Sequence, residues 1–594
     1  MKPALLFALV LLAALPFAAS LNGDFIEDDR PIVRDRVELR ALASIPALFA
    51  QTYWPRDSPG GLYRPLTMAS YALDRAVWGA DVSGAPSRLG VHATNLILNA
   101  VACLLVFALL RERSASALAA WSGAALFAVH PLHVEAVSHM VGRADLLMTA
   151  LFLAAFLLHG RGPGARLGAA ALYLSACLSK EMAVVLPGLL LTQAWLERGA
   201  ESVGAFALRQ ARELAPCAVA LAVFIALRGA ALGAAASPPA PFVWAAPPQY
   251  LAFEQPAPGE VSLTMIHAAG EILLLLVAPF RLSADYSGFP HATSPTLAVV
   301  ASGASIAAVV AAAAIAARRG WREPAFWLVW LGLTWLPVSN LLFASGIVLA
   351  ERTLYLPSVA LSGVVASALA RALERDRRWL ALPLAAIALF AALSASRAPL
   401  WRDARTLDEA TVSGGRYSGH IAKSGLVAEL IRELERRQDP AQDPATRERA
   451  LALARASLEE RPTATNLRQV ALLEEASGEL DAALEHRAAL YHFAPADLDN
   501  RDALLRLLDA AIARSESAGD TARALQLSGN GYVVAHQSGD PRLLEDWQSR
   551  IDRAYQRYID EAVASGDRAE VRRRLESLEQ VFPQHPLLQR YRDF

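Results

Sequence analysis

The sequence predicts an all-α protein in two parts, a polytopic transmembrane helical domain over residues 1–400 and a soluble helical domain over residues 401–594. Apolar residues make up 54% of the 594 residues and charged residues 19%, a balance typical of membrane proteins. Up to about residue 400, long apolar blocks alternate with short charged joints. From Trp401 onward, no uncharged run approaches the ~20 residues that a membrane-spanning helix needs.

The arrangement of arginines predicts about eleven spans in the first part, because cytoplasmic joints carry an excess of Lys and Arg. Five joints fit this rule, at residues 111–116, 160–166, 197–213, 318–323 and 371–378. An odd number of spans from a cytoplasmic N-terminus places the C-terminal domain on the external side. The predicted spans lie at residues 3–20, 90–110, 116–130, 144–159, 167–179, 182–196, 214–232, 295–316, 324–343, 353–370 and 379–396.

The apolar block at residues 262–280 does not fit this count. It is apolar enough to span, but counting it as a crossing would reverse every later joint. We therefore predict an interfacial or re-entrant helix in an external loop at 233–294, with His267 and Glu271 facing protein or water. The sequence leaves open whether this block crosses the membrane.

The first span has a second interpretation as a cleavable signal peptide, because Ala18-Ala19-Ser20 resembles a small-residue cleavage site. In both interpretations the acidic stretch LNGDFIEDDRPIVRDR, residues 21–36, emerges on the external side. It begins a long external loop at 21–89.

The unusual polar residues gather on that external side, in the first loop and in turns at 130–143, 179–181 and 345–352. Ionisable groups near a bilayer core are costly and are usually kept for function. This clustering predicts one external active site.

Asp28 and Asp29 are the candidate catalytic acids of the first loop. A carboxylate just outside a membrane can act as a general base toward an incoming hydroxyl group. The alternative is that these acids only orient the first span or cap a helix.

The turn HPLHVEAVSHMVGRAD contains His130, His133, Glu135 and His139. Spacings of three and four could bring some of these side chains to one helix face, where they could bind a divalent metal. The pattern lacks the HExxH order and an evident fourth ligand. Hydrogen-bonded residues of an active-site wall are therefore favoured, and no metal is predicted.

Four cations lie near span ends on the same external side: Arg64, Arg143, Lys180 and Arg352. Arginine can bind phosphate with two parallel hydrogen bonds, and lysine supplies a compact charge. Snorkelling from a helix end is the alternative for each of them. Together with the carboxylates, they predict a site for a lipid phosphate.

A set of motifs in fixed order gives these residues a family context. Between about residue 22 and residue 360, the chain resembles the transmembrane and tetratricopeptide-repeat-containing mannosyltransferases. That resemblance implies a C-type glycosyltransferase fold for the membrane domain. The motifs are FIEDDRPIV, YRPLTMASYALD, HATNLILNAVACLLV, ALFAVHPLHVEAVSHMVGRADLL, YLSACLSKEMAVVLPGLLL, LSADYS and WLPVSNLLFASGIVLAERTLYLPSV.

The resemblance implies transfer of a sugar, mannose in the characterised relatives, from a polyprenyl-phosphate carrier to an acceptor hydroxyl. Asp28 or Asp29 would take the proton in an inverting single displacement, since a retaining reaction would need a second carboxylate as nucleophile. The lipid-linked sugar is the co-substrate, and no cofactor is implied. The residues implied for the donor site are Arg64, His130, His133, Glu135, Arg143, Asp145, Lys180, Glu181, Glu351 and Arg352.

The C-terminal part shows helical spacing of apolar residues and resembles a degenerate tetratricopeptide-repeat solenoid. Pro462 and Pro495 each close a helical stretch, and their separation of about 33 residues is close to the 34-residue period of these repeats. Glycine turn signals recur at irregular spacing, at Gly478, Gly519, Gly539 and Gly566. A helical bundle without a peptide groove is the alternative. A solenoid here could hold a protein acceptor.

Two further functions compete with transfer of sugar to protein. One is the same chemistry on a lipid or glycan acceptor, and the other is a non-enzymatic membrane scaffold in which the repeats bind partners. A net charge of −1 argues against a nucleic-acid partner. The Ala-rich, Arg-over-Lys composition favours a bacterial inner-membrane protein with loop 1 and the C-terminal domain in the periplasm. In a eukaryote, the same topology would face the lumen of the endoplasmic reticulum.

Overall fold

The structure is a computed structural model that describes residues 3–55, 61–114, 116–233, 258–341, 347–436 and 443–592. These residues form helices and no β-strand, which confirms the predicted all-α class. The chain divides into two compact units, which part between Glu429 and Leu430. The first unit therefore extends past the predicted boundary at residue 400 and includes the segment from Trp401 to Glu429.

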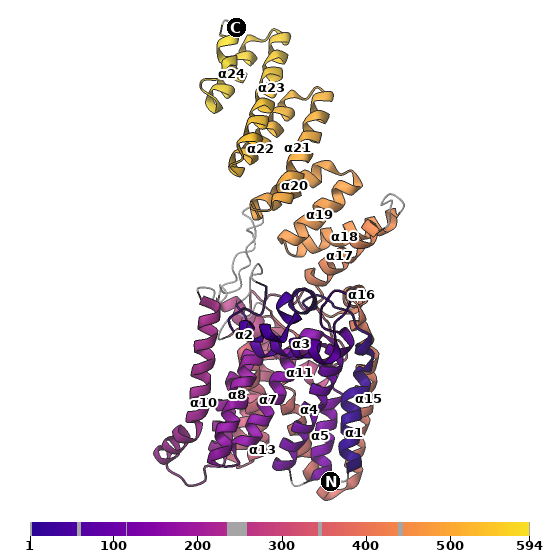
Figure 1. Cartoon of the computed structure of the whole chain (residues 1–594), viewed down its shortest axis with the longest axis vertical. Coiled ribbons are helices and arrows are strands. Elements are labelled where there is room, and N and C mark those ends of the chain that lie inside the picture. Colours follow the sequence, from indigo (N-terminus) through magenta and orange to yellow (C-terminus); the bar gives the residue numbers. More distant parts are fainter. Residues whose placement is uncertain are drawn as a thin grey trace. The chain divides into compact units, whose positions relative to one another are not determined.

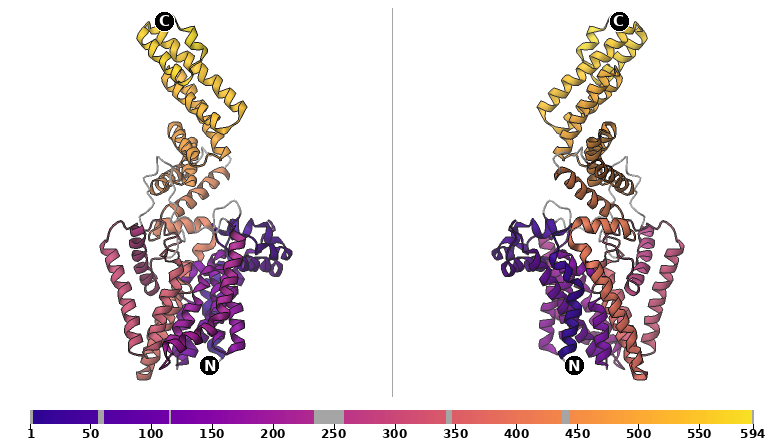
Figure 2. Two further views of the ribbon diagram at one scale, coloured as in Figure 1. Left: turned by 90° about the vertical axis from the view of Figure 1, so that its left-hand side faces the viewer. Right: turned by 90° about the vertical axis from the view of Figure 1, so that its right-hand side faces the viewer.

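The main helices of the first unit run side by side, as Figures 1 and 2 show from three directions. Each predicted span overlaps one of them. By length and composition, 7 helices in the described residues can cross a membrane, which confirms a polytopic protein. The count of about eleven stays a prediction. The helices that match predicted spans are α1 (Pro3–Ala14), α4 (Arg88–Arg113), α5 (Ala117–Ala128), α7 (Arg143–His159), α8 (Pro163–Ser179), α9 (Leu186–Leu196), α10 (Val203–Leu232), α12 (Leu297–Arg318), α13 (Arg322–Trp335), α14 (Val359–Arg375) and α15 (Ala381–Arg397).

The joints predicted for the cytoplasmic side pair with one another. Arg113 Nε lies 2.9 Å from Glu323 Oε2, and Arg166 Nη2 lies 3.0 Å from Glu213 Oε1. These two ion pairs connect four joints that are far apart in the sequence. The joints therefore gather at one end of the bundle, as the alternation of spans requires.

Helix α11 (Pro258–Val277) covers most of the block that did not fit the span count. Thr264 Oγ1 accepts a hydrogen bond from Ala292 N at 2.9 Å, and the Leu276 carbonyl lies 3.0 Å from His130 Nε2. Both halves of α11 thus contact segments predicted to be external, as expected of an interfacial helix. Since α11 is also long and apolar enough to cross a membrane, its interfacial position stays a prediction.

The second unit is a row of helices in which each packs on the next in the sequence. This succession is the contact pattern of a solenoid, in which each unit buries its apolar face against its neighbours. Its identity as a tetratricopeptide array stays a prediction. The helices are α18 (Pro444–Glu460), α19 (Ala464–Ser477), α20 (Leu480–Phe493), α21 (Leu498–Ser517), α22 (Thr521–Ser538), α23 (Pro541–Ser565), α24 (Arg568–Val581) and α25 (Pro586–Arg590), and they are orange to yellow in Figure 1.

The glycine signals of the second unit mark its turns. Gly539 and Gly566 end their helices with φ angles of 68° and 74°, in the left-handed region that glycine adopts without steric cost. Asp540 and Asp567 follow directly, and their carboxylates accept hydrogen bonds from the first backbone N–H groups of the next helix. The recurring Ser-Gly-Asp sequence therefore stops one helix and starts another.

Close packing in the first unit predicts the effect of replacing Gly363 in α14. A Cβ atom there would lie 2.1 Å from Cδ2 of the buried Trp327 of α13. We expect Gly363→Ala to lower the free energy of unfolding by about 1–3 kcal/mol through overpacking. Gly332→Ala is the control, because its Cβ would meet nothing within 4 Å. Thermal unfolding in detergent measures both, and equal midpoints would contradict the packing argument.

Candidate active site

Segments that are distant in the sequence meet at the end of the bundle that carries the first loop. Val141 N donates a 2.9 Å hydrogen bond to Asp29, which ties the loop to the turn before α7. Arg64 binds Glu181 just after α8, with Nη2 2.5 Å from Oε1. The structure thus brings together the external segments that the sequence predicts to form one site.

Asp29 anchors the first loop. Its carboxylate is buried and accepts hydrogen bonds from the N–H groups of Ile26, at 3.2 Å, and Val141, at 2.9 Å. His139 Nε2 lies 3.3 Å away. Burial raises the pKa of Asp29 well above its ordinary value, even though both backbone bonds lower it. Both of its carboxylate oxygens already accept backbone hydrogen bonds, so an acceptor hydroxyl would have to compete with these bonds.

Asp28 is placed differently from its neighbour. Its side chain is half-buried, and no residue in the described part of the chain donates a hydrogen bond to its carboxylate. Burial raises its pKa, while the nearby Arg352 and Arg64 lower it and Glu135 raises it further. Asp28 is therefore an available carboxylate beside two cations.

Glu27 is a further acid of the first loop that the sequence interpretation did not assign to the site. Its φ angle of 38° lies in the left-handed region, which is uncommon for a residue with a side chain and often marks a functional site. The surrounding protein raises its pKa to about 7, first by desolvation and then by the charge of Asp28. The signal was present in the sequence, because Glu27 stands directly before the two aspartates.

Arg352 is held by Glu135 and remains partly exposed. The backbone N of Arg352 donates to Glu135 Oε2 at 2.9 Å, and its Nη1 lies 2.5 Å from Oε1. Glu135 is buried, whereas 22% of the Arg352 side chain is exposed. A guanidinium group has five N–H donors, and only Nη1 is engaged with a described residue. The remaining donors can bind an incoming anion.

Two more cations of the site are paired with acids. Lys180 Nζ lies 2.7 Å from both carboxylate oxygens of Asp145, and both residues are buried. Arg64 binds Glu181 through Nε at 3.0 Å and Nη2 at 2.5 Å, in the bidentate geometry that arginine prefers. These pairs fix the positions of the predicted donor-site charges Arg64, Asp145, Lys180 and Glu181.

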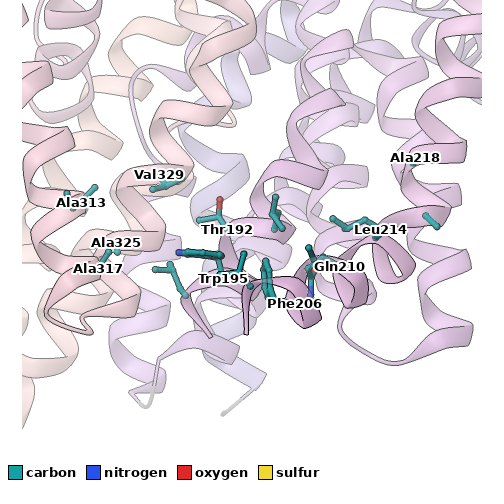
Figure 3. A pocket seen from close by; sticks show the side chains of 17 residues that line it. Thr192, Trp195, Phe206, Gln210, Leu214, Ala218, Ala313, Ala317, Ala325 and Val329 are labelled. Carbon is teal, nitrogen blue, oxygen red and sulfur yellow. The ribbon is translucent and has the colours of Figure 1, made fainter. Parts of the chain in front are cut away.

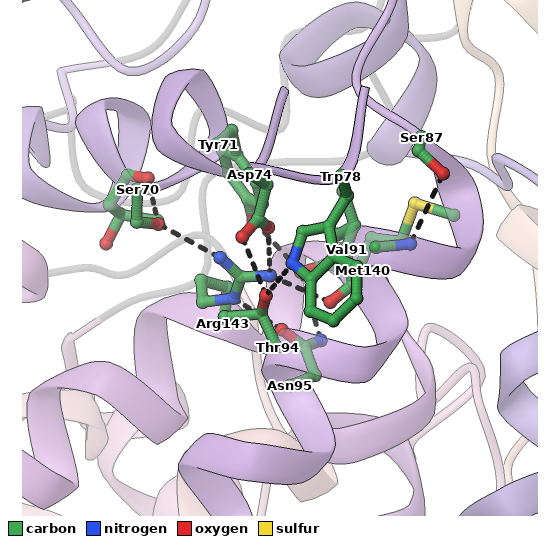
Figure 4. Close-up of polar contacts among 12 residues, drawn as sticks. Ser70, Tyr71, Asp74, Trp78, Ser87, Val91, Thr94, Asn95, Met140 and Arg143 are labelled. Carbon is green, nitrogen blue, oxygen red and sulfur yellow. Dashed lines mark hydrogen bonds and ion pairs between the residues drawn. The ribbon is translucent and has the colours of Figure 1, made fainter. Parts of the chain in front are cut away.

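Arg143 belongs to a separate buried network, shown in Figure 4. Its guanidinium group binds Asp74 at 2.7 Å, Asn95 at 2.5 Å, Ser70 at 3.2 Å and the Val91 carbonyl at 2.8 Å. These bonds join α3 (Pro65–Trp78), α4 and α7. Its geometry therefore indicates a structural position, in contrast to the phosphate-binding role that the sequence predicts.

Three other predicted donor-site residues are engaged with partners within the protein. His133 is buried with Nε2 2.9 Å from Ser358 Oγ, and His130 is buried next to α11. Glu351 is buried in an ion pair with Arg397. In the described part of the chain, no three His, Cys, Asp or Glu side chains are placed to hold a metal ion. A metal-free site stays a prediction.

Two acids from later segments border the first loop. Asp408 of α16 (Ala404–Gly414) is buried, and desolvation followed by the charge of Glu27 raises its pKa to about 8. Asp285 accepts hydrogen bonds from Gly419 N and Ala422 N, both at 3.0 Å, at the start of α17 (His420–Arg436). The segment after residue 400, predicted to be the start of the soluble domain, therefore packs beside the first loop.

The structural position of Arg143 can be tested by stability. Arg143→Ala leaves Asp74 and Asn95 buried without their partner, so we expect it to lower the free energy of unfolding by about 3–5 kcal/mol. Arg378→Ala is the matched control, because 94% of the Arg378 side chain is exposed. The measurement is the midpoint of thermal unfolding in detergent. An Arg143→Ala protein as stable as the control would point back to ligand binding.

Comparison with known proteins shows relatives of one kind. The chain is 31% identical over 187 residues to Protein O-mannosyl-transferase F38B6.6 of Caenorhabditis elegans, covering 30% of this chain and 26% of the relative. It is 33% identical over 182 residues to Protein O-mannosyl-transferase Tmtc1 of Drosophila melanogaster, covering 29% and 20%. Protein O-mannosyl-transferase Tmtc3 of the same fly is 26% identical over 425 residues, covering 58% and 44%.

These relatives confirm the resemblance that the sequence motifs indicate. The chain spans less than half the length of each of these three relatives. No family model and no solved structure matches the chain.

Proposed function

From its similarity to protein O-mannosyl-transferases, we propose that this chain is a membrane glycosyltransferase that transfers mannose from a polyprenyl-phosphate carrier to a hydroxyl group of a protein. The names of its relatives supply the sugar and the class of acceptor. The polytopic fold and the charged site at one end of the helices support a lipid-linked donor. The reaction needs no cofactor, because the carrier phosphate is itself the leaving group.

The observation that carries this proposal is the state of Asp28. The site acids Glu135, Asp145 and Glu181 are each bound to a cation. The carboxylate of Asp28, in contrast, accepts no hydrogen bond from the described residues. A free carboxylate at a surface that an acceptor can reach is the group expected of a general base. Asp28 therefore takes the proton from the acceptor hydroxyl, and Asp29 holds the loop that carries it.

Arg352 binds the carrier phosphate in this mechanism, with Arg64 and Lys180 as further positive charges. Arg352 and Arg64 lie close enough to Asp28 to lower the pKa of its carboxyl group. The acceptor oxygen attacks the anomeric carbon while the bond from that carbon to the phosphate oxygen breaks. The proton goes to Asp28, and the electron pair leaves with the polyprenyl phosphate. One base and one leaving group give inversion at the anomeric carbon.

The proposed location is a bacterial inner membrane, with the first loop and the C-terminal domain in the periplasm. The gathering of the arginine-containing joints at one end of the bundle supports this orientation, since such joints face the cytoplasm. The solenoid-like second unit presents the acceptor protein to the site.

Replacement of Asp28 tests the base. Purified protein is given polyprenyl-phosphate mannose with a radiolabelled sugar and a periplasmic protein extract, and label in protein is counted. We expect Asp28→Asn to lower kcat by at least about 10², the typical contribution of a general base. Asp24→Asn is the control, because Asp24 is an exposed acid of the same loop. Equal transfer by wild type and Asp28→Asn would remove Asp28 from the mechanism.

The rate of transfer should also depend on pH through Asp28. The base acts as a carboxylate, and burial raises its pKa above the ordinary value, so the rate should rise as the pH increases through this raised pKa. Initial rates measured between pH 4 and pH 8 show this rise. The Glu27→Gln variant should show the same rise of the rate with pH, because Glu27 is not the base. If the rate of Glu27→Gln no longer rises with pH, the group that titrates is Glu27.

A further inference from the structure

An apolar crevice of about 890 Å³ lies among α9, α10, α12 and α13, at the upper end of the ~300–1,000 Å³ typical of small-molecule sites. Its two polar lining residues are engaged within the protein. Thr192 Oγ1 donates to the Gly188 carbonyl at 2.8 Å, and Gln210 Nε2 lies 3.4 Å from Glu213 Oε2. Alanine, leucine and aromatic side chains form most of the rest (Figure 3). The crevice therefore suits a hydrocarbon chain.

The crevice lies at the end of the helices away from the candidate active site. Arg228, near the C-terminal end of α10, donates a hydrogen bond to the Gly61 carbonyl in the first loop. Gln210, in the N-terminal half of the same helix, lines the crevice. At a rise of 1.5 Å for each residue, these two positions lie about 27 Å apart along the helix. That distance is close to the ~30 Å thickness of a bilayer core.

The crevice is lined by aromatic rings and lies beside a positive charge, that of Arg198. Trp195 and Phe206 line it, with their rings 5.3 Å apart and edge to face. The Arg198 guanidinium lies 4.0 Å from the centre of the Trp195 ring. Arg198 Nη1 is shielded from solvent and has no hydrogen-bond partner among the described residues. A buried donor without a partner is costly, which indicates a missing acceptor.

We propose that this crevice binds an anionic glycerophospholipid of the cytoplasmic leaflet, with its acyl chains in the crevice and its phosphate on Arg198. An acyl chain gains little by moving from bilayer hydrocarbon to an apolar protein surface. Selection must therefore come from the headgroup, where arginine binds phosphate well. Basic pockets between helices on the cytoplasmic side are a known type of site for anionic headgroups.

The position of the crevice argues against the lipid-linked sugar as occupant. Its phosphate would lie beside Arg352 in the candidate active site, at the other end of the helices. Only its uncharged isoprenoid end could then reach the crevice, and this end would leave Arg198 without an acceptor. The occupant that satisfies both the apolar lining and Arg198 has its charge at this end.

The test is lipid retention by the purified full chain, measured by native mass spectrometry in detergent. The probes are phosphatidylglycerol and phosphatidylcholine with the same acyl chains, each titrated separately. We expect wild type to retain phosphatidylglycerol about fivefold better, because the choline cation of phosphatidylcholine offsets its phosphate, whereas phosphatidylglycerol keeps a net negative charge beside Arg198. Arg198→Gln should abolish this preference. Arg377→Gln, an exposed arginine of another predicted cytoplasmic joint, should keep it.

A second variant tests the crevice itself. Ala317 lines the crevice and is exposed, so the phenylalanine side chain of Ala317→Phe can fill the space without displacing core residues. Ala317→Phe should lower retention of both phospholipids and keep the melting temperature. The proposal is overturned if wild type shows no preference, if Arg198→Gln keeps the preference, or if polyprenyl phosphate displaces phosphatidylglycerol from wild type.

Discussion

The cost of burying charge shapes the polar end of this membrane domain. A buried ion is tolerated only with a partner of opposite charge or with several hydrogen bonds. Glu135 with Arg352 and Lys180 with Asp145 satisfy this constraint across segments that are far apart in the sequence. Each pair therefore both neutralises a charge and fixes one loop against another. Asp28, in contrast, lies beside Arg352 and Arg64, and its carboxylate accepts no hydrogen bond from the described residues.

The sequence predicted the fold well because hydrophobic periodicity and arginine placement act over long segments. Each predicted span overlaps a helix, and the glycine signals of the second unit fall at its turns. The unit boundary was harder to predict, because composition changes at Trp401 whereas packing continues to Glu429. The charges of α16 and α17 resemble those of a soluble domain. Only the structure shows that Asp408 and the start of α17 pack beside the first loop.

The sequence could predict which residues belong to the candidate site but only partly what each residue does there. Sequence reasoning identified Asp28, Glu135, Lys180 and Arg352 from residue type and predicted side. It could not separate them from Arg143, because an arginine that binds phosphate and an arginine that joins three helices look alike in a sequence. The distinction depends on which partners saturate the guanidinium group. For the same physical reason, Asp28 and Asp29 were equivalent until their hydrogen bonds were known.

The hydrogen bonds from the start of α17 to Asp285 affect how the tail can be removed. Asp285 accepts from Gly419 N and Ala422 N, so the first turn of α17 is held by a loop of the membrane unit. A truncation at residue 400 would expose Asp285 and remove Asp408 from beside Glu27. Loss of activity in such a shortened protein would then reflect damage to the first loop as much as loss of the second unit. Only a cut after α17, beyond Arg436, separates these two causes.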